Sequence, residues 1–272
     1  YEISLGLVGS EMCIRDRSDT DHFRHSASSV RPRLAGVGWG TGAHAGVNTV
    51  DSSARPALSV QALSKAYRTS KKAVFSNLTF ELPENGRLAI LGRNGQGKST
   101  LIRMLGGIMP PTSGKVVWRV SQSWPIGFGG GFQGSLSGLD NIRFLSRVYA
   151  RHFDEMREKV DAFAELGRSL HLPVKYYSSG MRARLAFGLS LAIDFDCYLI
   201  DELVAVGDSR FQEKCRHELF ERRAHRTFLM ASHDVGLIAE HCDRALVIES
   251  GQAKIFEDID EAVEVYRWLR AA

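Results

Sequence analysis

The sequence has no long hydrophobic run. A helix that spans a membrane needs about 18 or more consecutive apolar residues. The best candidate, residues 185–193, is too short and includes Gly188 and Ser190. We therefore expect another chain to supply the membrane part if this protein acts at a membrane.

Cysteine is scarce, and neither sign of charge dominates. The spacing of Cys13, Cys197, Cys215 and Cys242 matches neither a zinc site nor a disulfide framework, which predicts reduced thiols in a cytosolic protein. Thirty-five basic residues stand against 31 acidic ones, and this balance gives no indication of a nucleic-acid partner. The 272 residues are 44% hydrophobic, which is enough for a sizeable core in one large domain or two small ones.

Residues 1–54 show no pattern typical of a folded domain. The opening residues resemble a translated sequencing adapter, and they lack the basic stretch that begins a signal peptide. Residues 18–54 are rich in Ser, Arg, His, Gly and Ala without periodicity. We predict that 1–54 lie outside the fold, as an artefact or a disordered segment; a functional basic arm is the alternative.

From residue 55 onward, strand-like and helix-like patterns alternate. Short apolar runs predict strands at 58–62, 74–81, 87–91, 198–200, 228–230 and 245–248. Apolar residues at helical spacing follow residue 98 and recur over 140–170, 180–193 and 258–270. This alternation predicts an α/β fold with a largely parallel sheet and helices on both faces.

A glycine-rich motif follows the strand at 87–91. Residues 92–99, Gly-Arg-Asn-Gly-Gln-Gly-Lys-Ser, fit the phosphate-binding pattern G-x-x-x-x-G-K-[ST]. Glycines let successive N–H groups point inward, and the helix that follows adds a positive N-terminus. Lys98 would place a cation at the β- and γ-phosphates, and Ser99 would offer a hydroxyl to Mg²⁺. A chance match in a glycine-rich turn is the alternative. The predicted nucleotide-binding residues here are Gly92, Asn94, Gly95, Gly97, Lys98, Ser99 and Thr100.

Two adjacent carboxylates end the apolar strand at 198–200. Buried strands rarely end in paired acids without a cation partner, and a phosphate loop in the same chain suggests Mg²⁺. Asp201 would then hold the metal, and Glu202 would face the attacking water as a weak base that orients it. An exposed acidic turn is the alternative.

At this point residues 56–272 resemble the ATP-binding-cassette (ABC) ATPases. The run Tyr-Ser-Ser-Gly-Met at 177–181 is similar to the family's L-S-G-G-Q signature: Ser178 and Gly180 match, while Ser179 and Met181 depart from it. The resemblance implies that the signature acts across a homodimer, on ATP held by the partner's loop. It also implies a cassette over 55–272 with an antiparallel β subdomain and a helical subdomain at about 134–192.

Four further residues resemble family positions. His233, in Ala-Ser-His-Asp, resembles the switch histidine that contacts the γ-phosphate, and Tyr67 the aromatic that stacks on adenine. Gln133 resembles the glutamine that joins Mg²⁺ to the transmembrane partner, and Asp208 the aspartate that crosses the dimer interface. The proline usual after the catalytic glutamate is replaced by Leu203.

The motifs look most like those of polysaccharide-exporter ATPases of the capsular type. The resemblance implies a motor that uses ATP and Mg²⁺, binds transmembrane permease subunits at the cytoplasmic face of a bacterial inner membrane, and touches neither nucleic acid nor its polysaccharide cargo. Candidate residues for permease contact are Gln133 and the exposed aromatics expected at Phe144, Tyr149 and Phe153. O-antigen or teichoic-acid export remains an alternative. A soluble ABC ATPase acting on ribosomes or DNA is disfavoured by the single cassette and by the lack of heptads, and a regulator without turnover by the presence of Glu202.

Overall fold

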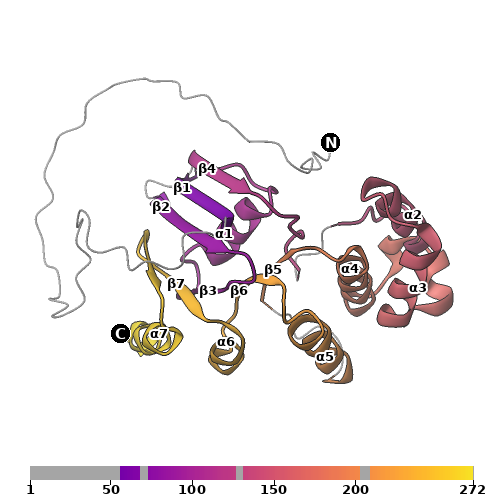
Figure 1. Cartoon of the computed structure of the whole chain (residues 1–272). Coiled ribbons are helices and arrows are strands. Elements are labelled where there is room, and N and C mark those ends of the chain that lie inside the picture. Colours follow the sequence, from indigo (N-terminus) through magenta and orange to yellow (C-terminus); the bar gives the residue numbers. More distant parts are fainter. Residues whose placement is uncertain (1–55, 68–72, 127–130, 203–208, 272) are drawn as a thin grey trace, which may run out of the picture.

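The computed structural model describes residues 56–67, 73–126, 131–202 and 209–271 (Figure 1). Residues 1–54, which we expect outside the fold, do not belong to these ranges. One sheet is antiparallel and has three strands in the order β2-β1-β4: β1 (Pro56–Ala66), β2 (Ala73–Pro83) and β4 (Ser113–Trp118). In its register Val60 lies opposite Phe80 on one side and Val116 on the other.

The second sheet has five strands in the order β5-β6-β3-β7-β8. Its members are β3 (Arg87–Leu91), β5 (Cys197–Asp201), β6 (Thr227–Ala231), β7 (Arg244–Glu249) and β8 (Gln252–Phe256). The first four in spatial order run parallel, and only the β7–β8 hairpin is antiparallel. Parallel strands of this kind are buried on both faces, which explains their continuous apolar sequences.

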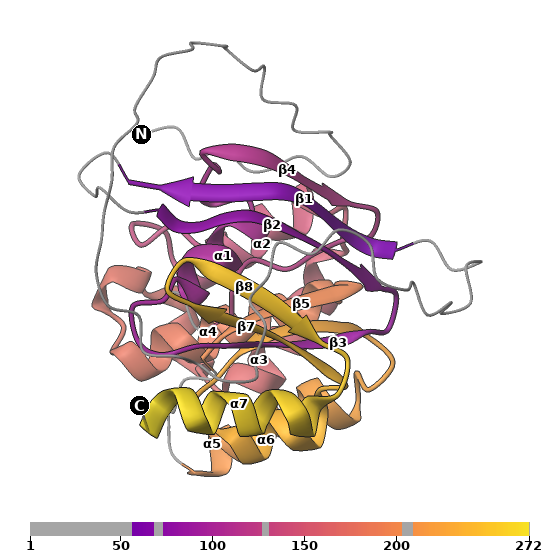
Figure 2. The same ribbon diagram turned by 90° about the vertical axis from the view of Figure 1, so that its left-hand side faces the viewer.

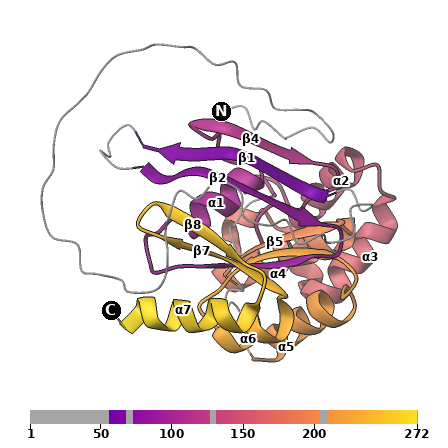
Figure 3. The same cartoon turned by 60° about the vertical axis from the view of Figure 1, so that its left-hand side comes forward.

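Successive residues of these strands enter two different cores. Leu88 and Ile90 of β3 pack with α1 (Lys98–Leu105) and the antiparallel sheet, so α1 lies between the two sheets (Figure 3). Ala89 and Leu91 face the opposite core. That core is covered by α5 (Ser209–Arg216), the π-helix η3 (His217–Glu221), α6 (Val235–His241) and α7 (Ile259–Ala271), with α7 along the lower side of the sheet in Figure 2. The predicted α/β fold with helices on both faces is confirmed.

A helical group stands to one side of both sheets in Figure 1. It contains α2 (Gly138–Val148), α3 (Phe153–Ala164), the short 3₁₀ helices η1 (Gly167–His171) and η2 (Val174–Tyr176), and α4 (Ser179–Ile193). Helix α4 is the longest of the described helices at 15 residues, and no helix in the described ranges is long and apolar enough to cross a membrane.

The range 140–170, expected to be helical, is divided into α2, α3 and the start of η1. The chain turns between α2 and α3, where Ala150 takes a left-handed φ of 50°. Tyr149 packs edge-on against Phe195, with ring centroids 5.5 Å apart, and Arg151 donates to the carbonyl of Ile193 at 2.8 Å. These contacts fold the turn onto the end of α4, a tertiary cause that helical periodicity alone does not show.

The sequence patterns also missed several regular elements, among them β4, β8, α5 and α6. β4 and β8 lie at sheet edges, α5 is strongly polar, and α6 has only seven residues. Each therefore has few apolar residues from which a pattern could be recognised, and each is stabilised by the neighbours it packs against.

Candidate nucleotide-binding site

The phosphate loop connects β3 to α1 and depends on glycine at two points. A Cβ on Gly92 would lie 2.5 Å from the carbonyl oxygen of Ile248, and one on Gly97 would lie 2.3 Å from Cγ1 of Val74. Gly97 also has a left-handed φ of 103° and accepts the first helical hydrogen bond, from the N–H of Leu101 at 2.9 Å. Side chains are excluded here, so the backbone can come close to a ligand.

Lys98 lies folded over this loop. Its Nζ donates to the carbonyl of Gly92 at 2.7 Å and to that of Arg93 at 3.2 Å, and only 7% of the residue is exposed. Burial lowers the pKa of the Lys98 ammonium, while the carboxylates of Glu202 and Asp201 act in the opposite direction. The ammonium therefore already lies within the loop and close to both acids.

Ser99 and Asp201 meet although 102 positions separate them in the sequence. The Ser99 hydroxyl donates to Oδ1 of Asp201 at 2.8 Å. A hydroxyl oxygen beside a carboxylate is the kind of oxygen donor set that Mg²⁺ takes in phosphate sites, where few ligands come from the protein. The residues present thus fit a magnesium ion held jointly with phosphate oxygens.

Glu202 and His233 lie at the carboxyl ends of two adjacent strands. Oε1 of Glu202 is 3.1 Å from Nε2 of His233, and both side chains reach solvent. Glu202 takes a left-handed φ of 51°, and its N–H donates to the carbonyl of Ala231 at 2.9 Å. This bond turns the chain out of β5 so that the glutamate faces the end of β6.

Two features of the site were not predicted from the sequence. The other ring nitrogen of His233, Nδ1, is 3.1 Å from the hydroxyl of Tyr266 in α7. Arg93 pairs with Glu249, and the side-chain oxygen of Gln96 accepts from the N–H of Ser250 at 2.8 Å, so the β7–β8 turn holds the loop. Tyr266 occupies an ordinary core position of an amphipathic helix, so no signal in the sequence distinguishes it.

Tyr67 stands beside the first turn of α1. Its hydroxyl is 3.4 Å from Oγ1 of Thr100, and 39% of the residue is exposed. The ammonium of Lys65 lies 5.4 Å from the ring centroid. An exposed ring next to the loop is available for stacking, and Asn94 and Gly95 are exposed in the loop itself.

The structure does not bring Gln133 to the metal-binding pair. Its backbone is held by the buried Asn141, which accepts from the Gln133 N–H at 2.7 Å and donates to its carbonyl at 3.0 Å. The Gln133 side chain is exposed and, within the described residues, has no hydrogen bond to Ser99 or Asp201.

The signature residues also lie apart from the loop of their own chain. Ser178 caps α4 by accepting from the N–H of Met181 at 3.1 Å, and both Ser178 and Ser179 are exposed. A Cβ on Gly180 would approach nothing closer than the Ser178 hydroxyl, at 3.9 Å. Figure 1 shows α4 and α1 on different sides of β5. Asp208 lies outside the described residues.

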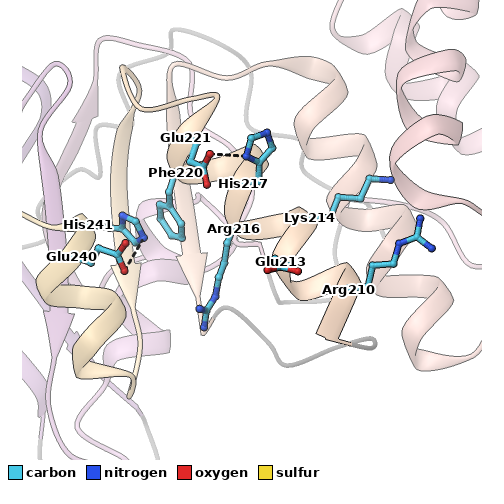
Figure 4. Close-up of a pocket in the computed structure, with 9 residues that line it drawn as sticks. All are labelled: Arg210, Glu213, Lys214, Arg216, His217, Phe220, Glu221, Glu240 and His241. Atoms are coloured by element: carbon cyan, nitrogen blue, oxygen red, sulfur yellow. Dashed lines mark hydrogen bonds and ion pairs between the residues drawn. The ribbon is translucent and has the colours of Figure 1, made fainter.

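A pocket of about 590 Å³ lies between α5, the π-helix and α6 (Figure 4). The rings of Phe220 and His241 stack there with centroids 4.1 Å apart, and burial lowers the pKa of His241. Nδ1 of His217 is 2.7 Å from a carboxylate oxygen of Glu221, so charged groups of the lining pair with one another. No residue that lines this pocket belongs to the phosphate loop.

Comparison with known proteins identifies the family of this chain. The ABC transporter family matches residues 75–205. The chain is 50% identical over 214 residues to the capsule polysaccharide export ATP-binding protein CtrD of Neisseria meningitidis serogroup B, a match that covers 78% of this chain and 99% of CtrD. It is 52% identical over 204 residues to the ATP-binding protein BexA of Haemophilus influenzae, covering 74% of this chain and 94% of BexA.

The fold is shared with solved structures of much lower identity. One is a dimeric ATP-binding cassette in a post-hydrolysis state bound to ADP and Pi, with a TM-score of 0.62 and 19% identity. The likeness covers 73% of this chain and 97% of that one.

Proposed function

Since this chain belongs to the ABC transporter family as an ATP-binding, ATP-hydrolysing subunit, we propose that it drives export of a lipid-linked capsular polysaccharide through a separate membrane permease. The observation that carries the proposal is the 50% identity to CtrD along 99% of that relative's length. The site supports it, because Lys98, the Ser99–Asp201 pair and the Glu202–His233 pair gather around one loop.

The binding step uses the loop and the residues around it. The inward N–H groups and the N-terminus of α1 bind the phosphates, and Lys98 exchanges its carbonyl partners for β- and γ-phosphate oxygens. Ser99 and Asp201 would hold Mg²⁺, which would neutralise part of the phosphate charge. Tyr67 supplies a ring face for the base.

The hydrolysis step uses the two groups at the strand ends. Glu202 orients the attacking water and accepts its proton, and His233 donates from Nε2 to the phosphoryl group being transferred. The exposed side chain of Gln133 would add one oxygen ligand to Mg²⁺ and so report the bound phosphoryl group to the permease. Ser99 and Asp201 would hold the metal without it, so basal hydrolysis would not depend on Gln133.

The chain works as a homodimer. Ser178 and the N-terminus of α4 face solvent, so they are free to grip the γ-phosphate of ATP held by the partner's loop. Asp208 joins the same interface.

An exposed apolar surface next to Gln133 suits a permease. The N–H of Val174 donates to the carbonyl of Leu136 at 2.9 Å, which brings the segment 172–176 beside the loop 133–137. The large apolar side chains exposed on these segments and on α2 are Leu136, Phe144, Val148, Leu172 and Tyr176. Of the three aromatics expected to be exposed, only Phe144 is; Tyr149 and Phe153 are half-buried, under Phe195 and Arg143 respectively.

We propose that the chain binds a permease through this surface, at the cytoplasmic face of a bacterial inner membrane. The polysaccharide is cargo of the complex and does not contact this subunit. No contact with nucleic acid is proposed.

The proposal is tested by measuring ATP hydrolysis and polysaccharide export separately. Gln133→Ala should leave the basal ATPase activity of the isolated subunit within about 3-fold, yet abolish surface polysaccharide in cells, and wild-type protein should co-purify a permease. Gln252→Ala, the same change at an exposed position of β8, is the control. Normal export by Gln133→Ala, or ribosomes in place of a permease, would contradict the proposal.

A further inference from the structure

The hydroxyl of Tyr266 connects α7 to the catalytic end of the parallel sheet. It lies 3.1 Å from Nδ1 of His233, and Nε2 of the same ring lies 3.1 Å from Oε1 of Glu202. Three side chains from α7, the end of β6 and the end of β5 thus form one continuous line. Tyr266 is 1% exposed, so its hydroxyl meets the histidine inside the core and not in solvent.

The partners of the ring decide where its proton lies. Nε2 of His233 lies 3.1 Å from Oε1 of Glu202. Because an ionised carboxylate only accepts hydrogen bonds, this close contact favours the tautomer in which Nε2 carries the hydrogen. In the neutral ring Nδ1 then has a lone pair, and the Tyr266 hydroxyl donates to it. Without the Tyr266 hydroxyl, the tautomer that carries its hydrogen on Nδ1 becomes accessible. In that tautomer Nε2 has no hydrogen and cannot donate to the phosphoryl group.

We propose that Tyr266 is a positioning residue for hydrolysis, which keeps the neutral ring of His233 in the Nε2–H form and aimed at the reacting phosphoryl group. This inference rests on the proposed role of His233. Tyr266 is buried, and we propose that it acts only through the histidine.

The structure holds the tyrosine firmly enough for this task. Helix α7 buries Ala262, Val263 and Leu269 along with Tyr266. Its first turn is tied by Asp258, whose Oδ1 accepts from the N–H groups of Asp260 at 2.8 Å and Glu261 at 3.1 Å. A ring buried in such a helix cannot follow the histidine if it rotates, so the bond selects one ring orientation.

The kinetic test is Tyr266→Phe, which removes one oxygen and keeps the ring. We expect the kcat for ATP to fall about 10-fold with an unchanged KM, as is typical when the partner that orients a functional histidine is lost. Tyr198→Phe is the matched control: Tyr198 is fully buried, and its hydroxyl bonds Nε of Arg223 at 3.1 Å, away from His233. Equal kcat values for the two variants would overturn the proposal.

The tautomer is read separately by ¹⁵N NMR of the histidine rings in the full chain. Nine histidines are present, and the His233 signals are assigned as those lost in His233→Ala. We expect the Nε2–H form in the wild type and an increased share of Nδ1–H in Tyr266→Phe. A wild-type ring in the Nδ1–H form would overturn the proposal even if the variant failed to fold.

A double variant separates this inference from the proposed function. In a His233→Ala background, Tyr266→Phe should cause no further loss of turnover, whereas an additional 10-fold loss would show a merely structural effect. If His233→Ala itself hydrolysed ATP normally, the proposed role of His233 would fail, while the NMR result would still report whether Tyr266 sets the tautomer.

Discussion

The phosphate loop and the signature helix are built in opposite ways. At the loop, polar groups are bonded within the chain: the buried Lys98 to the carbonyl of Gly92, and the half-buried Ser99 to Asp201. At the signature, Ser178 is exposed and bonds only the N–H of Met181 in its own first turn. Bonds within one chain hold the geometry of the phosphate loop. The exposed groups at the start of the signature helix are accessible to a ligand from another molecule.

Under the proposed function, this contrast would explain why two copies of the chain act together. We expect a loop whose groups are bonded to one another to bind nucleotide in a single chain. We expect the exposed N-terminus of α4 to gain its ligand only when a second chain brings one, so that hydrolysis would depend on dimerisation and binding would not. The predictions below test that separation.

The largest effect is expected for Glu202→Gln. The amide keeps the shape of the side chain but accepts no proton, so turnover should fall about 100-fold or more while ATP affinity persists. Phosphate release measures the first quantity, and size-exclusion chromatography with Mg-ATP should show a trapped dimer. Glu158→Gln, on the exposed face of α3, should behave as wild type; a monomeric Glu202→Gln with normal turnover would refute the role.

Lys98→Ala should weaken binding itself. The variant loses a cation that faces several phosphate charges, and charge-assisted bonds of this kind contribute about 1.5–3 kcal/mol, or roughly 10- to 100-fold in Kd. Titration calorimetry with ATP measures the change, and circular dichroism checks the fold. Lys159→Ala, exposed on α3, serves as the control. An unchanged Kd would show that the ammonium does not leave the Gly92 carbonyl.

Ser178→Ala should weaken ATP-driven dimerisation and leave ATP binding by the monomer unchanged. We expect ATP affinity to stay constant, and ATP-driven dimerisation and turnover to fall about 10-fold, through loss of one bond to the γ-phosphate. The variant also loses a helix cap, which costs about 1 kcal/mol of folding stability. Ser137→Ala removes the equivalent cap of α2, where Ser137 accepts from the N–H of Asp140 at 3.1 Å. If both variants lost turnover equally, capping alone would explain the effect.

The smallest effect is expected for deletion of residues 1–54. Strand β1 begins at Pro56 and obtains its partners from β2 and β4. ATP affinity should be unchanged, and the midpoint of thermal unfolding should move by less than about 2 °C. Loss of nucleotide binding would show that the segment contributes to the site.

Local sequence determined the parts of the site in which neighbouring residues do the chemistry. The glycine loop at 92–99 and the acids at 201–202 could be located because a short motif requires its residue types at set spacing. The strand assignments succeeded for the same reason, since strands buried on both faces consist of continuous apolar residues. The alternation of strands and helices was enough to predict the α/β class.

Tertiary structure alone decided the contacts between distant residues. The break after α2 arises where Tyr149 meets Phe195, and the loop is held by Glu249, 156 positions from Arg93. Tyr266 meets His233 because α7 returns across the sheet, yet in the sequence it is one more apolar position of an amphipathic helix. Periodicity reports which face of an element is buried, whereas the polar atom that a buried hydroxyl meets depends on how the elements pack.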